Sequence, residues 1–569
     1  MIFNDIGMNK RVLTISAFLF VFICTYAQLS TNELPVSYSI GSKLVETKRA
    51  MTAITMPELN MSEIEEEDIE DVKDDIPPRF GYLHRVNYNL DNSGVWYELP
   101  NGDKLWQFNV ICPSALSVNF CFDRFWIPKG GKFFVYSKDR KHSIGAFTNK
   151  KNKGDRDNIR GFATGIVYGN DVILEYYQPK NLTSDAVISI EYVVHGYRYI
   201  TIGTNGTRHY GESGSCMVNI NCEEGQDWQY EKNAVAMIIV NGNRVCTGSL
   251  INTTSLSQEP LFLTANHCTS HYGDAMSNSN LDFFSFYWNY EAPGCINPAT
   301  EPTYYTTSGA TILANNPSTD FALLRLTEDP NTISNYNPFY LGWDVSGERG
   351  TPGVCIHHPK GDVKKISTVA YPPVLSGYSN LNFWEVYWRP TTNGHGTTQP
   401  GSSGSALLNG EHNVIGQLYS GTADCDKPNG YNRYGRLDLS WAGNGDNSIY
   451  RGLSHWLDFL ATGYQSIQGL FVVSDSTIIE TDMNLKCNIK VVAEGCLVIQ
   501  GSVEMSNNTK VFVESGAVLL IDGGLLSNVT LELKSSSTLK IINGGVLDTL
   551  TEFVAPIGAQ VLIESGQIL

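Results

Sequence analysis

The stretch "TTQPGSSGSALL", residues 397–408, places three serines among glycines and ends in an apolar run. A Gly-Ser-Ser-Gly-Ser run is typical of a flexible loop, and taken alone the loop is the favoured interpretation. The same run also suits a tight turn that presents a serine hydroxyl as a nucleophile. For this second interpretation to hold, the upstream sequence has to supply a base and a carboxylate.

Two upstream segments supply those partners. The segment "PLFLTANHCTS" (260–270) places His267 at the end of an apolar strand, and "STDFALLRL" (318–326) places Asp320 at the start of another. Histidine, aspartate and serine in this order are typical of the chymotrypsin-like double β-barrel. The nucleophile turn of the lipase fold would instead need glycine at position 405, where this chain has Ser405.

The chemistry of peptide-bond cleavage assigns a role to each residue. A serine hydroxyl needs an imidazole to take its proton, and the imidazole needs a carboxylate to fix its tautomer and to stabilise the cation that forms. We therefore predict that Ser403 is the nucleophile, His267 the general base and Asp320 the residue that orients it. Gly401 lets the backbone turn, so the amides of Gly401 and Ser403 are predicted to form the oxyanion hole. This chemistry needs no cofactor.

Further segments around these residues carry a family resemblance. The chain from about residue 211 to 463 resembles the lysyl endopeptidase family of secreted bacterial serine proteases, and residues 79–200 are similar to the propeptides of that family. The resemblance implies the same three catalytic residues, a chymotrypsin-like fold, and protein or peptide substrates. The segments that carry it, in chain order, are "CTGSLINTT…PLFLTANHC", "FYWNY", "STDFALLRL", "IHHPKGDVKKIS", "QPGSSGSALL" and "YGRLDLSW".

The cysteines are interpreted with the help of the same resemblance. Six of the twelve cysteines stand where the family has them, which implies the disulfides Cys216–Cys425, Cys222–Cys295 and Cys246–Cys268. Cys355 has no partner in the family and is expected to be a buried thiol. Two further pairs lie close in sequence and could form disulfides: Cys112 with Cys121, and Cys487 with Cys496.

The chain departs from the family at the positions that bind the substrate side chain. Lysine-specific members carry a glutamate and an aspartate where this chain has Gln399 and Asn432. Thr397 and Ser420 complete an uncharged pocket, and a buried cation without a counter-charge would be costly there. We therefore expect an uncharged or aromatic residue before the scissile bond. Specificity for lysine or arginine remains the alternative if Asp424 or Asp426 reaches the pocket.

Composition and charge predict where the protein is located and argue against certain kinds of partner. The net charge of −18 argues against nucleic-acid binding, and the acidic run Glu63–Asp75 is expected to be a solvated linker. A short apolar run follows Lys10 and Arg11 and predicts a secretory signal peptide. Export agrees with paired cysteines. The pair His357-His358 has no further ligand at metal-binding spacing, so no metal site is predicted.

The chain divides into five regions by its patterning. The last region repeats every 21 residues and is predicted to be a β-solenoid, and one helix is expected near "GLSHWLDFLAT" (452–462). An alternative function is that of a surface adhesive protein, in which the solenoid binds a cell-surface or extracellular partner and the protease-like domain is inactive. The regions are a signal peptide (1–27), an acidic, poorly ordered leader (28–78), a β-rich propeptide (79–210), a serine protease domain (211–463) and the solenoid repeats (464–569).

Overall fold

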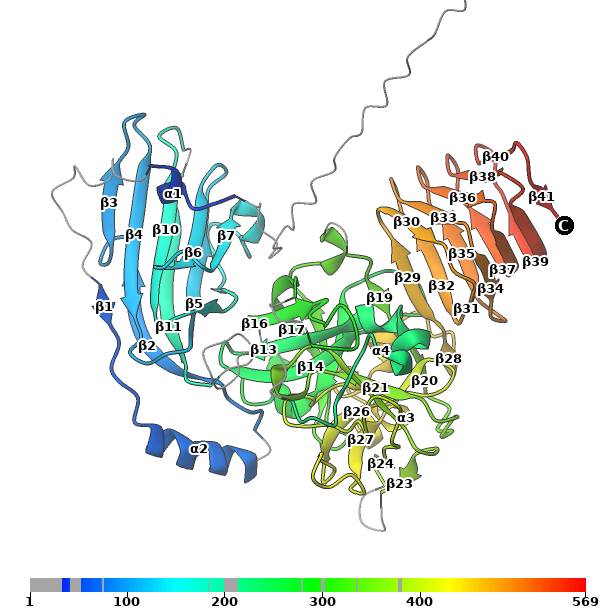
Figure 1. Cartoon of the computed structure of the whole chain (residues 1–569), viewed down its shortest axis with the longest axis horizontal. Helices are drawn as coiled ribbons and strands as arrows, with labels where there is room; N and C mark the ends of the chain where they lie inside the picture. The colour runs from blue at the N-terminus through cyan, green and yellow to red at the C-terminus, as the bar shows by residue number, and fades with distance from the viewer. Residues whose placement is uncertain are drawn as a thin grey trace, which may run out of the picture.

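The computed structural model describes residues 33–40, 53–73, 76–182, 184–198, 213–277, 280–297, 302–333, 336–376 and 381–569. The predicted signal peptide and the junction at Tyr210–Gly211 lie outside these ranges. Figure 1 shows three bodies in sequence: a β-sandwich in blue and cyan, a central domain in green and yellow, and a stack of short strands in orange and red. The mainly β fold expected from the sequence is confirmed. None of the helices in the described ranges is long and apolar enough to span a membrane.

The N-terminal sandwich, which we call the prodomain, consists of two sheets packed on one apolar core. One sheet has the order β1-β4-β10-β6-β7 with β3 beside β4, and the other has the order β2-β11-β5-β8 with β9 beside β5. Alternate residues of each strand face the core, as in other sheet-on-sheet packings. The strands are β1 (Ile54–Thr55), β2 (Gly81–Asn89), β3 (Val95–Glu98), β4 (Lys104–Ile111), β5 (Ser117–Trp126), β6 (Lys132–Ser137), β7 (Ser143–Phe147), β8 (Phe162–Ala163), β9 (Val167–Tyr168), β10 (Asp171–Gln178) and β11 (Val187–Gly196).

The expected disulfide between Cys112 and Cys121 is wrong. Both cysteines are free and buried. Cys112 follows β4 in one sheet and packs in the core between the sheets, whereas Cys121 lies in β5 of the other sheet. The Cys121 side chain packs with Val194 and with Phe283 of the central domain, so it points away from Cys112. Proximity in sequence does not place them on one hairpin.

The acidic run expected to be a solvated linker is instead helix α2 (Met61–Lys73), which follows the short α1 (Val36–Ile40). Glutamate is a good helix former, and Ile64 anchors the helix because only 4% of its surface is exposed. Arginines from other segments neutralise part of the acidic charge: Arg79 pairs with Asp68 at 2.8 Å and Arg244 pairs with Asp71 at 2.8 Å. The helix is therefore part of the contact between prodomain and central domain.

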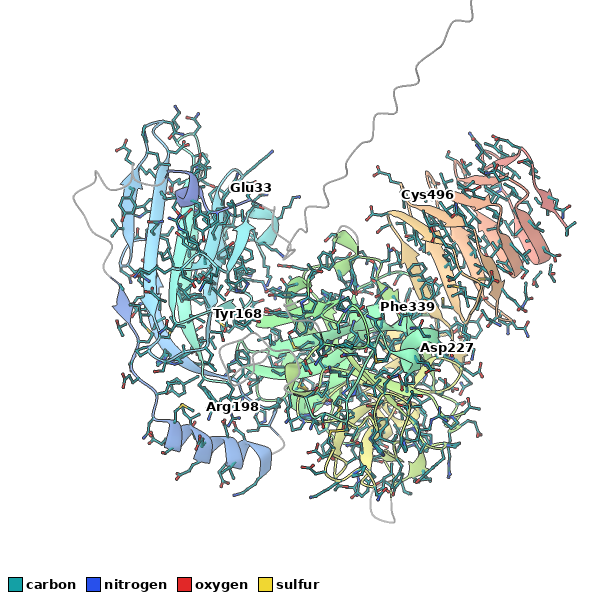
Figure 2. The ribbon with its side chains drawn as sticks, in the orientation of Figure 1. Glu33, Tyr168, Arg198, Asp227, Phe339 and Cys496 are labelled. Carbon is teal, nitrogen blue, oxygen red and sulfur yellow. A yellow bond between two sulfur atoms is a disulfide. The ribbon has the colours of Figure 1, made fainter. Side chains whose placement is uncertain are left out.

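The prodomain docks on the first barrel of the central domain through polar contacts. The Phe80 N–H donates to the carbonyl of Asn243 at 2.9 Å, and the Asn119 side chain donates to the carbonyl of Gly242 at 2.9 Å. The Arg160 guanidinium pairs with Asp282 of β16 at 2.6 Å. Tyr168 and Arg198, labelled in Figure 2, lie on the side of the prodomain that faces the central domain.

The first half of the central domain is a closed barrel of six antiparallel strands in the order β13-β14-β15-β18-β17-β16. Most residues of its strands are buried, on both faces of each strand, so the outer surface of the barrel is covered as well as its interior. The β15–β18 pair matters most for function, since it places Ala265 opposite Phe321. The barrel strands are β13 (Val235–Val240), β14 (Arg244–Leu250), β15 (Leu261–Ala265), β16 (Asn280–Trp288), β17 (Tyr305–Asn316) and β18 (Phe321–Leu326).

The second half is a curved sheet in the order β12-β22-β21-β25-β26-β27-β24-β23, with β20 beside β26. The helix expected over 452–462 is shorter than predicted: α4 (Ser454–Leu457) ends at Asp458, whose carboxylate accepts from the N–H groups of Thr462 and Gly463. The elements of this half are β12 (Val218–Asn219), β19 (Phe339–Tyr340), β20 (Gly342–Asp344), β21 (Val354–His357), β22 (Lys365–Thr368), β23 (Val374–Leu375), β24 (Phe383–Val386), β25 (Ala406–Leu408), β26 (Asn413–Gly421), β27 (Asn432–Arg436) and α3 (Leu437–Trp441).

The C-terminal repeats form a β-solenoid of parallel strands, as the sequence predicts. Two stacks run along it, β29-β32-β35-β37-β39 and β30-β33-β36-β38-β40, and β31-β34 joins β37. The strands are β28 (Ser466–Ile467), β29 (Gly469–Val473), β30 (Ser476–Ile479), β31 (Met483–Leu485), β32 (Cys487–Val491), β33 (Cys496–Ile499), β34 (Ser502–Met505), β35 (Lys510–Val513), β36 (Val518–Asp522), β37 (Leu525–Leu533), β38 (Thr538–Ile542), β39 (Val546–Val554), β40 (Gln560–Ile563) and β41 (Gln567–Ile568).

The coil spacing differs in detail from a uniform period of 21 residues. Ile499, Ile521, Ile541 and Ile563 are stacked in register, so successive coils are 22, 20 and 22 residues long. Turns of different length absorb the difference while the apolar interior stays aligned. Cys487 and Cys496 are free, because they lie in β32 and β33 of different stacks, so the disulfide between them is also wrong.

The solenoid is joined to the central domain by shared sheets and not by a linker alone. Strand β29 pairs with β19 of the central domain, with Phe339 opposite Phe471, and β28 pairs with β20. One apolar core runs from the barrel through Phe339 and Trp343 into Leu470 and the solenoid interior. Phe339 is labelled in Figure 2 where the two bodies meet.

Candidate active site

The histidine and the aspartate of the predicted triad form a hydrogen-bonded pair. His267 lies in the single 3₁₀ turn η5 (Asn266–Cys268) after β15, and Asp320 directly precedes β18, so the β15–β18 pairing brings them together. His267 Nδ1 is 2.8 Å from Asp320 Oδ2, and the backbone N–H of His267 donates to Oδ1 at 2.9 Å. Because Nδ1 donates to the carboxylate, Nε2 is left to accept a proton.

Asp320 is held in an unusual backbone conformation. Its φ of +57° is left-handed, which a non-glycine residue seldom adopts without support from its surroundings. Its carbonyl oxygen accepts from the Asn266 N–H at 2.7 Å, while both carboxylate oxygens bind His267. The aspartate side chain is 5% exposed, so the carboxylate and the imidazole interact in a largely dry environment.

The three serines of the turn 402–405 differ in burial and in hydrogen bonding. Ser402 and Ser405 are fully buried. The Ser402 hydroxyl lies 2.7 Å from His357 Nδ1, and the Ser405 hydroxyl lies 3.1 Å from the Cys355 sulfur. Ser403 alone is partly exposed. Among the three, Ser403 is the serine whose hydroxyl a substrate can reach.

The backbone of this turn leaves two amides available. Ser402, Gly404 and Ser405 each donate their N–H to a carbonyl oxygen. Among the described residues, the N–H groups of Gly401 and Ser403 donate to no protein acceptor. Gly401 has a φ of +96°, and a Cβ there would approach Lys360 N to 3.0 Å. Two N–H groups without a protein acceptor are thus present at the two positions predicted to bind a developing oxyanion.

Thr247 of β14 connects the serine turn to the first barrel, and the sequence analysis did not single it out. Its backbone N–H donates to the Ser403 carbonyl at 2.8 Å, and its hydroxyl donates to the Gly401 carbonyl at 2.8 Å. The same hydroxyl accepts from the His358 N–H at 3.2 Å. The sequence signal is slight, since Thr247 only follows Cys246 in a strand.

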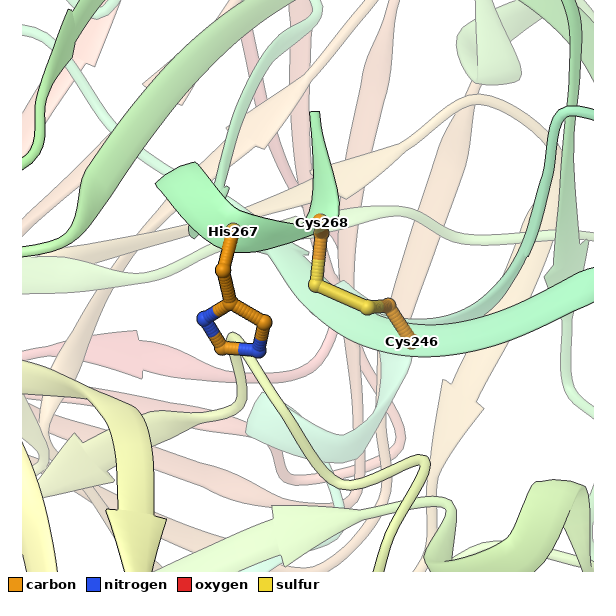
Figure 3. A group of neighbouring side chains, drawn as sticks. All are labelled: Cys246, His267 and Cys268. Carbon is orange, nitrogen blue, oxygen red and sulfur yellow. A yellow bond between two sulfur atoms is a disulfide. The ribbon is translucent and has the colours of Figure 1, made fainter. Parts of the chain in front are cut away.

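The disulfide Cys246–Cys268 lies beside His267, as Figure 3 shows. Cys246, His267 and Cys268 have ligand atoms within 4.8 Å of one another, a spacing that could hold a metal. Both sulfurs are bonded to each other and cannot act as thiolate ligands, and the imidazole is engaged by Asp320. These groups therefore fit a fixed histidine loop and not a metal centre.

The structure also contains the disulfides Cys216–Cys425 and Cys222–Cys295, the same pairs that the family resemblance implies. Cys355 is a buried free thiol, and burial raises its pKa to about 11. It is therefore neutral near pH 7 and is not a reactive thiolate.

The four residues predicted to line the specificity pocket are used in different ways. Gln399 accepts from the Gly214 N–H at 2.8 Å and donates to Asp424 at 2.8 Å. Asn432 accepts from the indole of Trp388 at 2.5 Å. The Thr397 hydroxyl is buried and has no hydrogen-bond partner among the described residues. Ser420 is half-buried in β26 opposite Arg433.

An aromatic pair from the second sheet lies beside His267, and no local sequence motif predicts it. The ring of Tyr419 lies edge-on to His267 with centroids 6.1 Å apart, and Phe383 packs on Tyr419 at 5.0 Å. Phe383 therefore supports Tyr419, which lies beside the imidazole. His358, the second histidine of the predicted pair, is buried with Nδ1 2.9 Å from the Asp362 carbonyl, and among the described residues it belongs to no group of three possible metal ligands.

Comparison with known proteins relates part of the chain to one family of proteases. Residues 210–435 match the family model of the lysyl endopeptidase C-terminal domain. This part of the chain resembles a lysyl endopeptidase, as the sequence motifs predicted. A curated lysyl endopeptidase from Pseudomonas aeruginosa is 29% identical over 287 residues, covering 47% of this chain and 59% of the relative. The chain thus spans about three-fifths of the length of that relative.

Solved serine proteases are also similar in part. A serine endoprotease from Yersinia pestis is 15% identical with a TM-score of 0.25, covering 38% of this chain and 63% of its own. A Glu endopeptidase is 19% identical with a TM-score of 0.23, covering 40% of this chain and 92% of its own. At TM-scores this low, neither neighbour bears on the fold or the site.

Proposed function

We propose that this protein is a serine endopeptidase that cleaves peptide bonds through an acyl-enzyme on Ser403. The observation that carries the proposal is the hydrogen-bonded pair His267–Asp320 together with the unpaired amides of Gly401 and Ser403. The serine turn contacts the histidine loop, since the Ser403 carbonyl lies 3.8 Å from the sulfur of Cys268, the residue after His267. The proposed nucleophile and oxyanion site lie on the serine turn, and the proposed base lies on the histidine loop that this turn contacts.

The geometry supports the following sequence of steps. Ser403 Oγ forms a bond to the substrate carbonyl carbon while its proton passes to His267 Nε2. The carbonyl oxygen becomes an oxyanion bound by the amides of Gly401 and Ser403, and Asp320 stabilises the imidazolium. The C–N bond then breaks as the imidazolium protonates the leaving amine. Water, deprotonated by the same imidazole, hydrolyses the ester and restores Ser403.

We further propose that the pocket accepts an uncharged residue before the scissile bond, with tyrosine preferred. The Thr397 hydroxyl has no hydrogen-bond partner among the described residues and is covered in the unbound structure. We expect substrate binding to uncover it, so that it can pair with the phenolic hydroxyl of a tyrosine. The amides of Gln399 and Asn432 are already bonded within the protein. Asp424 bonds to Gln399 and is the nearest acid to this group, which keeps lysine or arginine as the competing specificity.

The protein is proposed to be an exported zymogen whose prodomain is removed by cleavage at Tyr210–Gly211. Its three disulfides fit an extracellular protein. The docking of the prodomain on the first barrel, through Asp282 and Gly242, supports a role for this domain as the partner of the unprocessed enzyme. A tyrosine before the junction agrees with the proposed specificity.

Purified wild type and the Ser403→Ala variant test both levels of the proposal. We expect wild type to hydrolyse a protein substrate and to begin at Gly211 by N-terminal sequencing, while Ser403→Ala is inactive and keeps its prodomain covalently attached. Mature wild type that begins after Arg208 would contradict self-processing at Tyr210 but leave the endopeptidase intact. Hydrolysis by a pure Ser403→Ala preparation would contradict the endopeptidase mechanism itself.

A further inference from the structure

A second histidine near the nucleophile takes no part in the steps above. His357 ends β21 and is fully buried, with 0% of its surface exposed. Its Nδ1 is 2.7 Å from the Ser402 hydroxyl, and its Nε2 is 3.0 Å from the Ser367 hydroxyl of β22. A buried imidazole with a partner on each nitrogen is held in one orientation.

The surrounding hydrogen bonds fix the direction of each contact. The Ser367 hydroxyl donates to the Thr397 carbonyl at 2.7 Å, so it must accept from His357 Nε2–H. His357 Nδ1 then carries no proton and accepts from the Ser402 hydroxyl, which itself accepts from the Gln399 N–H at 3.3 Å. The chain of bonds runs from Ser402 through His357 and Ser367 to Thr397.

The imidazole is neutral in this chain of bonds. Burial and, as a smaller cause, the nearby ammonium of Lys365, its register partner in β22, together lower the pKa of His357 to about 3. A protonated ring would lose the acceptor that Ser402 needs. The bonds therefore stay in place at neutral pH.

We propose that His357 is a positioning residue. It holds the turn that contains Gly401 and Ser403, together with the predicted specificity pocket, in one arrangement. One end of the chain of bonds is Ser402, which lies between the two residues whose amides bind the oxyanion. The other end is the carbonyl of Thr397, whose side chain carries the unpaired pocket hydroxyl. This role rests on the proposed function, because it acts only through the Ser403 turn.

The two ends of this chain of bonds predict different kinetic defects. Without the hydrogen bond between Ser402 and His357, the turn can shift, and the amides of Gly401 and Ser403 no longer point at the oxyanion. This should lower kcat about 10- to 100-fold with little change in KM. Without the Ser367 bond, the Thr397 wall can move, which should raise KM and weaken discrimination between residues before the scissile bond. Loss of His357 should do both.

The experiment measures kcat, KM and melting temperature for Ser402→Ala, Ser367→Ala, His357→Leu and His357→Gln on a series of short peptide substrates. Gln can accept from Ser402 and donate to Ser367, so His357→Gln should recover much of the loss seen in His357→Leu. The double variant His357→Leu/Ser402→Ala should have the same kcat as His357→Leu alone. Ser405→Ala, a buried serine of the same turn whose hydroxyl contacts Cys355 and Tyr434 and not His357, is the matched control and should keep wild-type kinetics.

Each outcome decides the matter. If Ser402→Ala folds and keeps wild-type kcat, or if its loss adds fully to that of His357→Leu, the proposal is wrong. If His357→Leu does not fold, Ser402→Ala and Ser367→Ala still separate the kcat defect from the KM defect. Activity in Ser403→Ala, measured alongside, would overturn the proposed function and not this inference alone.

Discussion

At the scale of single residues, burial and hydrogen bonding separate three serines that the sequence places in one turn. Ser402 is occupied by His357 and Ser405 lies against Cys355, whereas Ser403 is accessible and its amide is unpaired. The order of histidine, aspartate and serine along the chain predicts Ser403 as the nucleophile. The structure adds a physical reason, because the other two hydroxyls cannot reach a substrate without breaking buried contacts.

Specificity can be tested at the same scale by restoring the two missing acids. Asn432→Asp should shift the preference of the enzyme toward lysine by about tenfold in kcat/KM, because a carboxylate gives the ammonium a charge-assisted partner. Gln399→Glu should shift it less, because the new carboxylate would face Asp424, which now accepts from the Gln399 amide at 2.8 Å. A peptide-library profile measures both variants.

Asp424→Asn is the control for that experiment. If the wild type already prefers lysine or arginine and Asp424→Asn abolishes the preference, Asp424 is the pocket acid and the proposed uncharged pocket is wrong. If no acid substitution changes the profile, these positions do not line the pocket.

The candidate site could be predicted from sequence only where its members lie in local motifs. His267, Asp320 and Ser403 each stand in a recognisable segment. The contacts of Thr247, His357 and Tyr419 depend on how strands from distant parts of the chain pair. A single sequence does not show the register of such pairings. The buried partners of Gln399 and Asn432 were hidden for the same reason.

At the scale of elements, a buried lysine makes the prodomain contact sensitive to pH. Lys153 donates to Ser308 of β17 at 2.9 Å, and burial lowers its pKa from 10.5 to about 8. The charges around it are Glu328 and Asp282, which favour its protonated form, and Lys151 and Arg160, which oppose it. Folding in the docked form therefore releases a proton between about pH 8 and pH 10.5, so stability should rise with pH in that window.

The substitution Lys153→Met removes this cost, which is on the order of 3 kcal/mol. In a Ser403→Ala background that keeps the prodomain attached, we expect Lys153→Met to melt at least as high as its parent at pH 7.5. The difference should shrink toward pH 10 as the parent gains stability. A difference that grows with pH would contradict the buried, protonated lysine.

Elements were predicted well where apolar residues alternate and poorly where charge dominates. The acidic run became helix α2 because Arg79, just after it in sequence, and Arg244, distant in sequence, compensate part of its charge. The helix predicted over 452–462 is longer than α4, because the prediction used only the spacing of apolar residues. Asp458 ends the helix by accepting a hydrogen bond from the N–H of Gly463. In both cases tertiary partners outweighed local composition.

At the scale of the whole molecule, the solenoid stabilises the central domain through the sheets that they share. A boundary at residue 463 would remove β28 and β29 and expose the partners of Phe471 and Leu470. We expect a chain that ends at residue 463 to lose on the order of 5 kcal/mol of stability, since each buried apolar side chain contributes about 1.5–3 kcal/mol. A chain that ends at residue 505, after β34, keeps the shared sheets and should retain kcat/KM on short peptides within about twofold.

Melting temperature and peptide hydrolysis of the two truncated chains measure this directly. If the shorter chain melts and cleaves like the full protein, the shared core contributes nothing and the domains are independent. If the longer chain folds but is inactive, outer coils of the solenoid take part in catalysis.

The central claim is that Ser403 is the nucleophile, activated by His267 and Asp320. A serine-reactive phosphonate followed by peptide mapping tests it most directly, because the reagent bonds covalently to the hydroxyl that the imidazole deprotonates. We predict a single label on Ser403, abolished in His267→Ala, with none on Ser402 or Ser405. Labelling of Ser402 or Ser405, or equal labelling of Ser403 in the His267→Ala variant, would contradict the account.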